Sequence, residues 1–107
     1  MNAFNKCGER YERGFVHDED MKFKATARRD RLLGLWATEK LGLSGPRAQD
    51  YARSLVQISL ERQGDEEIFS KLRKDFDDKA VTLSDHRVRR TMDELLQTAL
   101  EQVRNGS

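Results

Sequence analysis

The chain has 107 residues, 36% of them hydrophobic and 36% charged, so it can form one small domain with a single modest core. Its 20 basic and 19 acidic side chains give a net charge of +1, which excludes the strong positive field of a typical nucleic-acid-binding domain. No stretch reaches the roughly 18 apolar residues of a membrane span and no apolar signal segment opens the chain, so we expect a soluble, cytoplasmic protein.

Residues 1–17 come first, and we expect them to form a flexible arm. Gly8 and Gly14 each cost about 1 kcal/mol against Ala inside a helix, and a segment this short is marginal as an isolated helix. Three aromatic residues spaced seven and four positions apart would share one face of an induced helix, namely Phe4, Tyr11 and Phe15. Exposed rings need a partner, so the arm either packs back onto the domain or enters a groove of another protein.

A long amphipathic helix is predicted from His17 to Leu43. Three acids, Asp18 to Asp20, stand at its start, where exposed backbone N–H groups favour negative charge. Gly42 suits the position just after the last turn. Apolar residues recur at helical spacing on two sides of this segment, so it should pack against neighbours on both.

Three shorter helices follow, with boundaries set by turn and cap residues. We expect them at Pro46 to Gly64, Asp65 to Lys79 and Ser84 to Asn105, with Asp65 and Ser84 as N-caps. Four amphipathic helices joined by short connections predict an all-α fold, a compact antiparallel four-helix bundle spanning residues 18–107, with the arm outside it.

No residue pattern indicates catalysis or cofactor binding. The cluster His17 to Asp20 is rich in metal-ligand types, but consecutive residues on a helix point in different directions, and the acids already suit a helix start. His86 follows a helix cap without a paired nucleophile or acid, and Cys7, the single cysteine, is interpreted as an incidental thiol. We therefore predict a non-enzymatic protein with no metal and no cofactor.

Arg28 and Arg29 lie at the edges of the apolar stripe of the long helix, where apolar residues were expected. The interpretation we favour is an ion pair with an acid of the third or fourth helix, or an extended side chain that keeps its charge in water. The alternative is a secondary contact with an anion or a partner. In that case they could join a second basic group to form a positive patch, namely Arg87, Arg89 and Arg90.

Several segments resemble the zeta subunit of bacterial F-type ATP synthase, over nearly the whole chain and in matching order. The residues that carry the resemblance are Phe15, His17, Asp18, Phe23-Lys24-Ala25, Ala27-Arg28-Arg29, Leu32-Leu33-Gly34-Leu35-Trp36-Ala37, Tyr51-Ala52-Arg53, Arg89-Arg90 and Met92-Asp93-Glu94-Leu95-Leu96.

The resemblance implies a four-helix regulatory subunit that inhibits ATP hydrolysis. Its N-terminal segment, residues 1–17 here, would enter a catalytic interface of the ATPase head as an induced helix, while the helical domain stays outside. The resemblance assigns this contact to Phe4, Glu12 and Phe15 by residue type and to Tyr11 as an aromatic. It implies the head subunits as partners, a monomer when free, and peripheral association with the membrane-bound enzyme.

The arm departs from the family pattern at Asn5, Cys7, Gly8 and Gly14, where charged helix-forming residues are expected. The two glycines add about 2 kcal/mol to the cost of forming a helix, roughly 30-fold in affinity. The alternative function is therefore a helical adaptor of another complex, which binds through the arginine patch and inhibits weakly or not at all.

Overall fold

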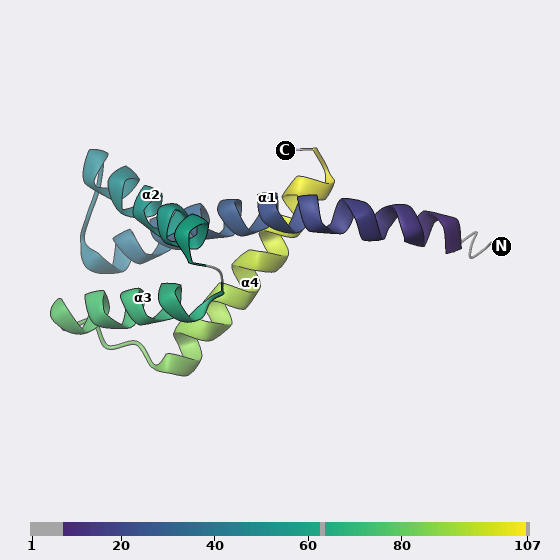
Figure 1. Ribbon diagram of the computed structural model, residues 1–107. Helices are drawn as coiled ribbons and strands as arrows, with labels where there is room; N and C mark the ends of the chain where they lie inside the picture. The colour runs from purple at the N-terminus through teal and green to yellow at the C-terminus, as the bar shows by residue number, and fades with distance from the viewer. Residues whose placement is uncertain (1–7, 63, 107) are drawn as a thin grey trace.

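The computed structural model describes residues 8–62 and 64–106, with side chains from residue 19 onward. Four helices make up the fold, α1 (Gly8–Leu41), α2 (Pro46–Glu61), α3 (Glu66–Asp78) and α4 (Asp85–Arg104), and the described residues contain no strand. Successive helices run in alternating directions, with α4 inclined to α1 (Figure 1). The predicted all-α four-helix fold is confirmed.

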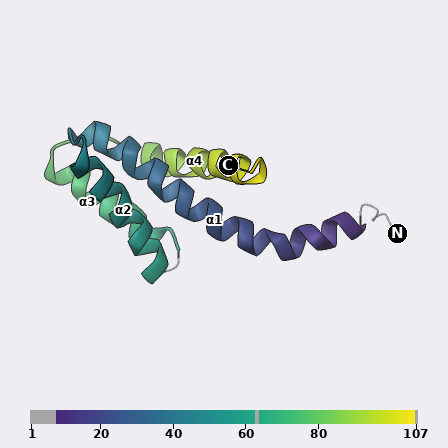
Figure 2. The ribbon, with the colours of Figure 1, turned by 90° about the horizontal axis from the view of Figure 1, so that it is seen from above.

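The long helix α1 is the centre of the arrangement. It packs chiefly against α2 and α4, while α3 makes smaller contacts with each of the other three. Seen from above, α1 passes between α4 on one side and α2 and α3 on the other (Figure 2). This is the two-sided packing that its two apolar stripes predicted.

All four helices contribute to one hydrophobic core. Its fully or nearly fully buried members are Leu33, Ala37, Leu55, Ile68, Leu72, Phe76, Val88 and Met92. The ring of Trp36 meets that of Phe76 edge to face, with centroids 5.8 Å apart, a geometry that adds about 1 kcal/mol to the area the rings bury.

Gly34 allows α1 and α2 to approach closely. A Cβ atom at this position would lie 2.5 Å from the Cα of Ala52, a distance that no packed pair of atoms tolerates. The small side chain of Ala52, only 2% exposed, completes the contact. The crossing of the two helices therefore depends on glycine at position 34.

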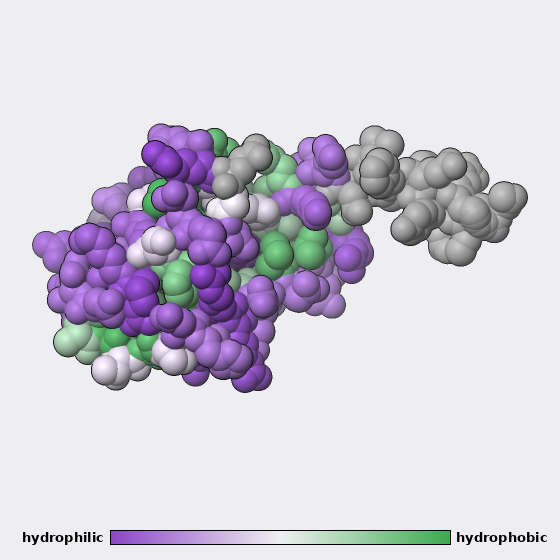
Figure 3. All heavy atoms as spheres, turned by 60° about the horizontal axis from the view of Figure 1, so that its bottom comes forward, coloured by the Kyte–Doolittle hydropathy of each residue, from purple (hydrophilic) through white to green (hydrophobic). Residues whose placement is uncertain are grey.

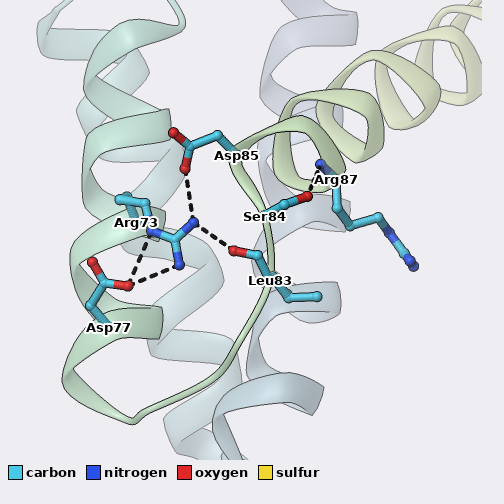
Figure 4. A network of polar contacts seen from close by, with 6 residues as sticks. All are labelled: Arg73, Asp77, Leu83, Ser84, Asp85 and Arg87. Carbon is cyan, nitrogen blue, oxygen red and sulfur yellow. Dashed lines mark hydrogen bonds and ion pairs between the residues drawn. The ribbon is translucent and has the colours of Figure 1, made fainter.

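Arg73 fixes the connection between α3 and α4 (Figure 4). Its Nη1 atom donates to the carbonyl oxygen of Leu83 at 2.6 Å and to Oδ1 of Asp85 at 2.9 Å, while its Nε and Nη2 atoms donate to Asp77. Ser84 then caps α4, because its Oγ atom accepts the backbone N–H of Arg87 at 3.0 Å. The predicted Ser84 cap is confirmed.

One predicted helix start and one predicted cap bond differ from the structure. The first helix begins at Gly8, so Gly14 and the acids Asp18 to Asp20 lie inside α1, and the position predicted for its start was wrong. Asp65 occupies the N-cap position of α3 but makes no side-chain cap bond. Its carboxylate pairs with an arginine of α1 instead.

Candidate functional site

The N-terminal part of α1 extends beyond the other three helices, in both ribbon views (Figures 1 and 2). Of the arm residues assigned to partner contact, Phe4 lies outside the described residues. Tyr11, Glu12 and Phe15 belong to helix α1, and the structure describes their backbone but not their side chains. The structure thus provides a helical backbone for the candidate contact residues from Gly8 onward.

Two large apolar side chains are exposed close to the point where α1 leaves the other helices. Phe23 of α1 is 62% exposed and Leu60 of α2 is 55% exposed, and both line one hollow between the two helices, together with Ser59 and Asp65. Elsewhere, on the face seen in Figure 3, hydrophilic residues predominate and the apolar patches are small and separate. The projecting end of α1 therefore has an apolar base.

Arg29 is buried in an ion-pair network that joins α1 to the start of α3. Its Nε atom donates to Oδ1 of Asp30 and its Nη2 atom to Oδ1 of Asp65, each at 2.8 Å. Burial alone would lower the pKa of Arg29, but the hydrogen bonds and charges of Asp65 and Asp30 outweigh it and raise the pKa. With 1% exposure, Arg29 offers no surface for a partner. Its pairing with Asp65 is the interpretation that the sequence favoured.

Asp30 is the most constrained member of this network. Asp30 is fully buried, and its Oδ2 atom has no hydrogen-bond partner among the described residues. Burial raises the pKa of Asp30, although a hydrogen bond from Ser59 and the charge of Arg29 oppose the shift. The ion pairs of Arg29 therefore connect α1 to the start of α3 near the base of the projecting helix, at some electrostatic cost.

Arg28 faces α4. The Nη1 atom of this half-buried residue donates to Oε1 of Gln102 at 3.2 Å. It therefore helps to attach α1 to the C-terminal part of α4, and it remains a candidate for a secondary contact.

The second basic group does not combine with Arg29 into a positive surface. Arg89 forms two hydrogen bonds with Glu66, both 3.1 Å long, and its guanidinium stacks 3.9 Å from the ring centroid of Phe69. Arg90 pairs with Glu94, and Arg87 donates to Thr91. Arg29 and Arg89 both contact the start of α3. Their charges are compensated there by two consecutive acids, Asp65 and Glu66.

Sequence reasoning did not place two further arginines in the candidate site, Arg31 of α1 and Arg53 of α2. Both are exposed, and with Lys24 and Arg28 they line a groove beside α1. The three-residue spacing from Arg28 to Arg31 indicated a shared helix face. No pattern in the sequence placed Arg53 opposite that face.

The described side chains include no group of three His, Cys, Asp or Glu residues arranged to bind a metal ion. Within residues 8–62 and 64–106, no helix combines the length and apolar character needed to cross a membrane.

Comparison with known proteins decides the family. The family model of the ATPase inhibitor subunit zeta matches residues 1–102. The chain belongs to this family. A solved structure described as "Solution NMR structure of the protein" is 37% identical, covers 81% of this chain and 99% of its own, and superposes with a TM-score of 0.69. No curated protein matches the sequence.

Membership in the zeta family agrees with the predicted regulatory role and with a non-catalytic protein. The matched region includes the N-terminal segment, residues 1–17.

Proposed function

We propose that this protein is an inhibitory subunit of the F-type ATP synthase, and that residues 1–17 enter a catalytic interface of the head as a helix and block ATP hydrolysis. In this proposal residues 18–107 form the domain that holds the segment from outside, and the contact residues of the segment are Phe4, Tyr11, Glu12 and Phe15. The protein acts as a monomer that associates peripherally with the membrane-bound enzyme through the head.

One observation carries the proposal. α1 runs without a break from Gly8 to Leu41, and its N-terminal part projects beyond the other helices (Figure 1). A wedge must be accessible on all sides and continuous with a folded support, and a helix that extends from a packed domain meets both conditions. Binding then costs less ordering entropy than it would for an unstructured peptide.

The central test is steady-state ATP hydrolysis by the cognate ATP synthase head, titrated with the full chain and with a chain that lacks residues 1–15. The hydrophobic core described above begins at Leu33, so the shortened domain should keep its Trp36 fluorescence and its cooperative unfolding. We expect the full chain to inhibit and the deletion to lose inhibition. Equal inhibition by the two chains would refute the proposal.

A point variant localises the contact. Phe15→Ala should weaken inhibition by roughly 10-fold or more, the typical effect of removing an aromatic anchor. Leu60→Ala is the matched control, because Leu60 is a large apolar side chain, 55% exposed, on α2. If the control loses inhibition and Phe15→Ala does not, the contact with the head lies on the domain and not on the N-terminal segment.

A further inference from the structure

A groove runs beside α1, between α2 and the end of α4. It consists of two adjoining hollows of about 580 and 280 Å³, both of which are lined by Arg31 and Val56. Ala27 of α1 and Val103 of α4 line the larger hollow, and Ala52 of α2 lines the smaller one. The groove is therefore long and open, with small apolar residues along it.

Among the residues that the structure describes, every charged residue that lines this groove is a cation, namely Lys24, Arg28, Arg31 and Arg53. Other hollows of the molecule differ. Glu19, Lys22 and Asp65 line the one that holds Leu60, and the hollow between α2 and α3 mixes two glutamates with an arginine and two lysines. The single sign of charge is thus a local property, which the net charge of +1 conceals.

Two of these cations, Lys24 and Arg53, are held only weakly by their neighbouring acids. Lys24 lies 3.4 Å from Asp20 and Arg53 lies 3.2 Å from Asp50, with all four side chains more than 60% exposed. Exposed pairs of this kind contribute little to stability, because water screens their charges. None of the ion pairs among the described residues includes Arg31. A carboxylate from outside can therefore replace either acid at little cost.

We infer that this groove binds an acidic amphipathic segment of a partner protein. The occupant places its apolar side chains along Ala27, Val56 and Val103 and its carboxylates against the cations. Phe23, 62% exposed, stands at one end and gives the segment an aromatic contact. A polyphosphate or nucleic-acid backbone would use the cations but leave the small apolar residues uncovered, so a protein segment fits the groove better.

This inference rests on the proposed function, which places the acidic segment on the ATP synthase head. The groove begins at Phe23, on the same helix as the N-terminal segment and a short distance along it. Occupation of the groove and entry of the segment can therefore occur together. Two linked contacts bind more tightly than either alone, because the second one forms at a high effective concentration.

The test uses the full chain with the double substitution Arg31→Glu and Arg53→Glu. The matched control, Lys74→Glu with Arg90→Glu, makes the same charge change at exposed cations outside the groove, each paired with an acid four positions later. Affinity for the immobilised cognate head is measured at several salt concentrations, and hydrolysis is measured at saturating inhibitor. Circular dichroism and urea unfolding verify that both variants fold.

We expect the groove variant to lose roughly 10-fold or more in affinity and to show a flatter salt dependence, while its maximal inhibition at saturation is kept. A groove variant that binds like the control overturns the inference and leaves the wedge intact. A wild-type chain that does not bind the head overturns both proposals.

A photo-cross-linking residue at Gln49, an exposed residue of the groove, identifies the occupant. Attachment to an acidic segment of a head subunit is the expected result. Attachment to a basic segment, to nucleotide or to lipid contradicts it.

Discussion

Replacement of Arg29 tests how the base of the projecting helix is held. Arg29→Met keeps most of the side-chain volume but removes both 2.8 Å ion pairs, to Asp30 and to Asp65. The side chain of Asp65 is 49% exposed and can be hydrated, whereas that of Asp30 is fully buried. Breaking a buried pair on one side costs about 3–5 kcal/mol, because the remaining charge is left uncompensated.

That loss is large beside the total stability of a small domain, about 5–15 kcal/mol. Urea unfolding followed by the fluorescence of Trp36 measures it, since this single tryptophan packs against Phe76 in the core. The matched control is Arg31→Met, an exposed arginine of the same helix, which should change stability by no more than about 0.5 kcal/mol.

A second variant separates loss of the charge from loss of packing. Arg29→Met combined with Asp30→Asn removes both buried charges and should recover much of the stability that Arg29→Met alone loses. If Arg29→Met costs less than about 1 kcal/mol, or if the second substitution recovers nothing, the network does not hold the base of α1 in the way described.

Three further predictions concern α1. Gly34→Ala should lower stability by about 1–3 kcal/mol through overpacking against Ala52, although Ala is the better helix former; a raised melting temperature would contradict the close contact. Because burial raises the pKa of Asp30, wild-type stability falls relative to Asp30→Asn as the pH rises from the ordinary pKa of the carboxyl to its raised one. Urea titrations at increasing pH, starting from about pH 4, should show the difference growing. Gly14→Ala, inside α1, should tighten inhibition of the cognate head by up to roughly 5-fold if helix formation limits affinity, and an unchanged inhibition constant would mean that the helix is already fully formed before binding.

Much of the fold was predictable because its signals are local. Helical spacing of apolar residues, a proline at the start of α2 and the serine cap of α4 each act within a few residues, and all of them agree with the structure. Asp65 shows the limit of this reasoning. A cap residue can also bind a distant partner, and its carboxylate pairs with Arg29, 36 positions earlier in the chain.

The start of α1 was missed for a different reason. Glycines at positions 8 and 14 and the acids after His17 argued for a late start, on the assumption that the segment must form a helix alone. Once residues 19–41 are packed as a helix, each added residue requires only extension, and the nucleation cost is already met. The glycines then weaken the extension without preventing it.

The features of the candidate site were predictable only where their signals are local. The alignment of Tyr11 and Phe15 depends on helical spacing alone, so the sequence could suggest it. The burial of Arg29 was indicated only as a conflict, a charged residue on an apolar stripe, and the groove beside Arg31 and Arg53 was not indicated at all. Grooves form between elements, and their lining depends on packing angles that no local pattern encodes.

The structure also connects the two proposed contacts mechanically. From Gly8 to Phe23, α1 extends roughly 22 Å at about 1.5 Å per residue, so the direction of its base sets the position of its tip. The base is held by the buried pairs of Arg29 and by the close approach at Gly34, both of which resist rotation of α1 against α2 and α3. The buried charges are costly for stability, but they orient the helix. A domain that holds this helix rigidly and binds a segment of the head in the adjacent groove would direct the tip toward one catalytic interface.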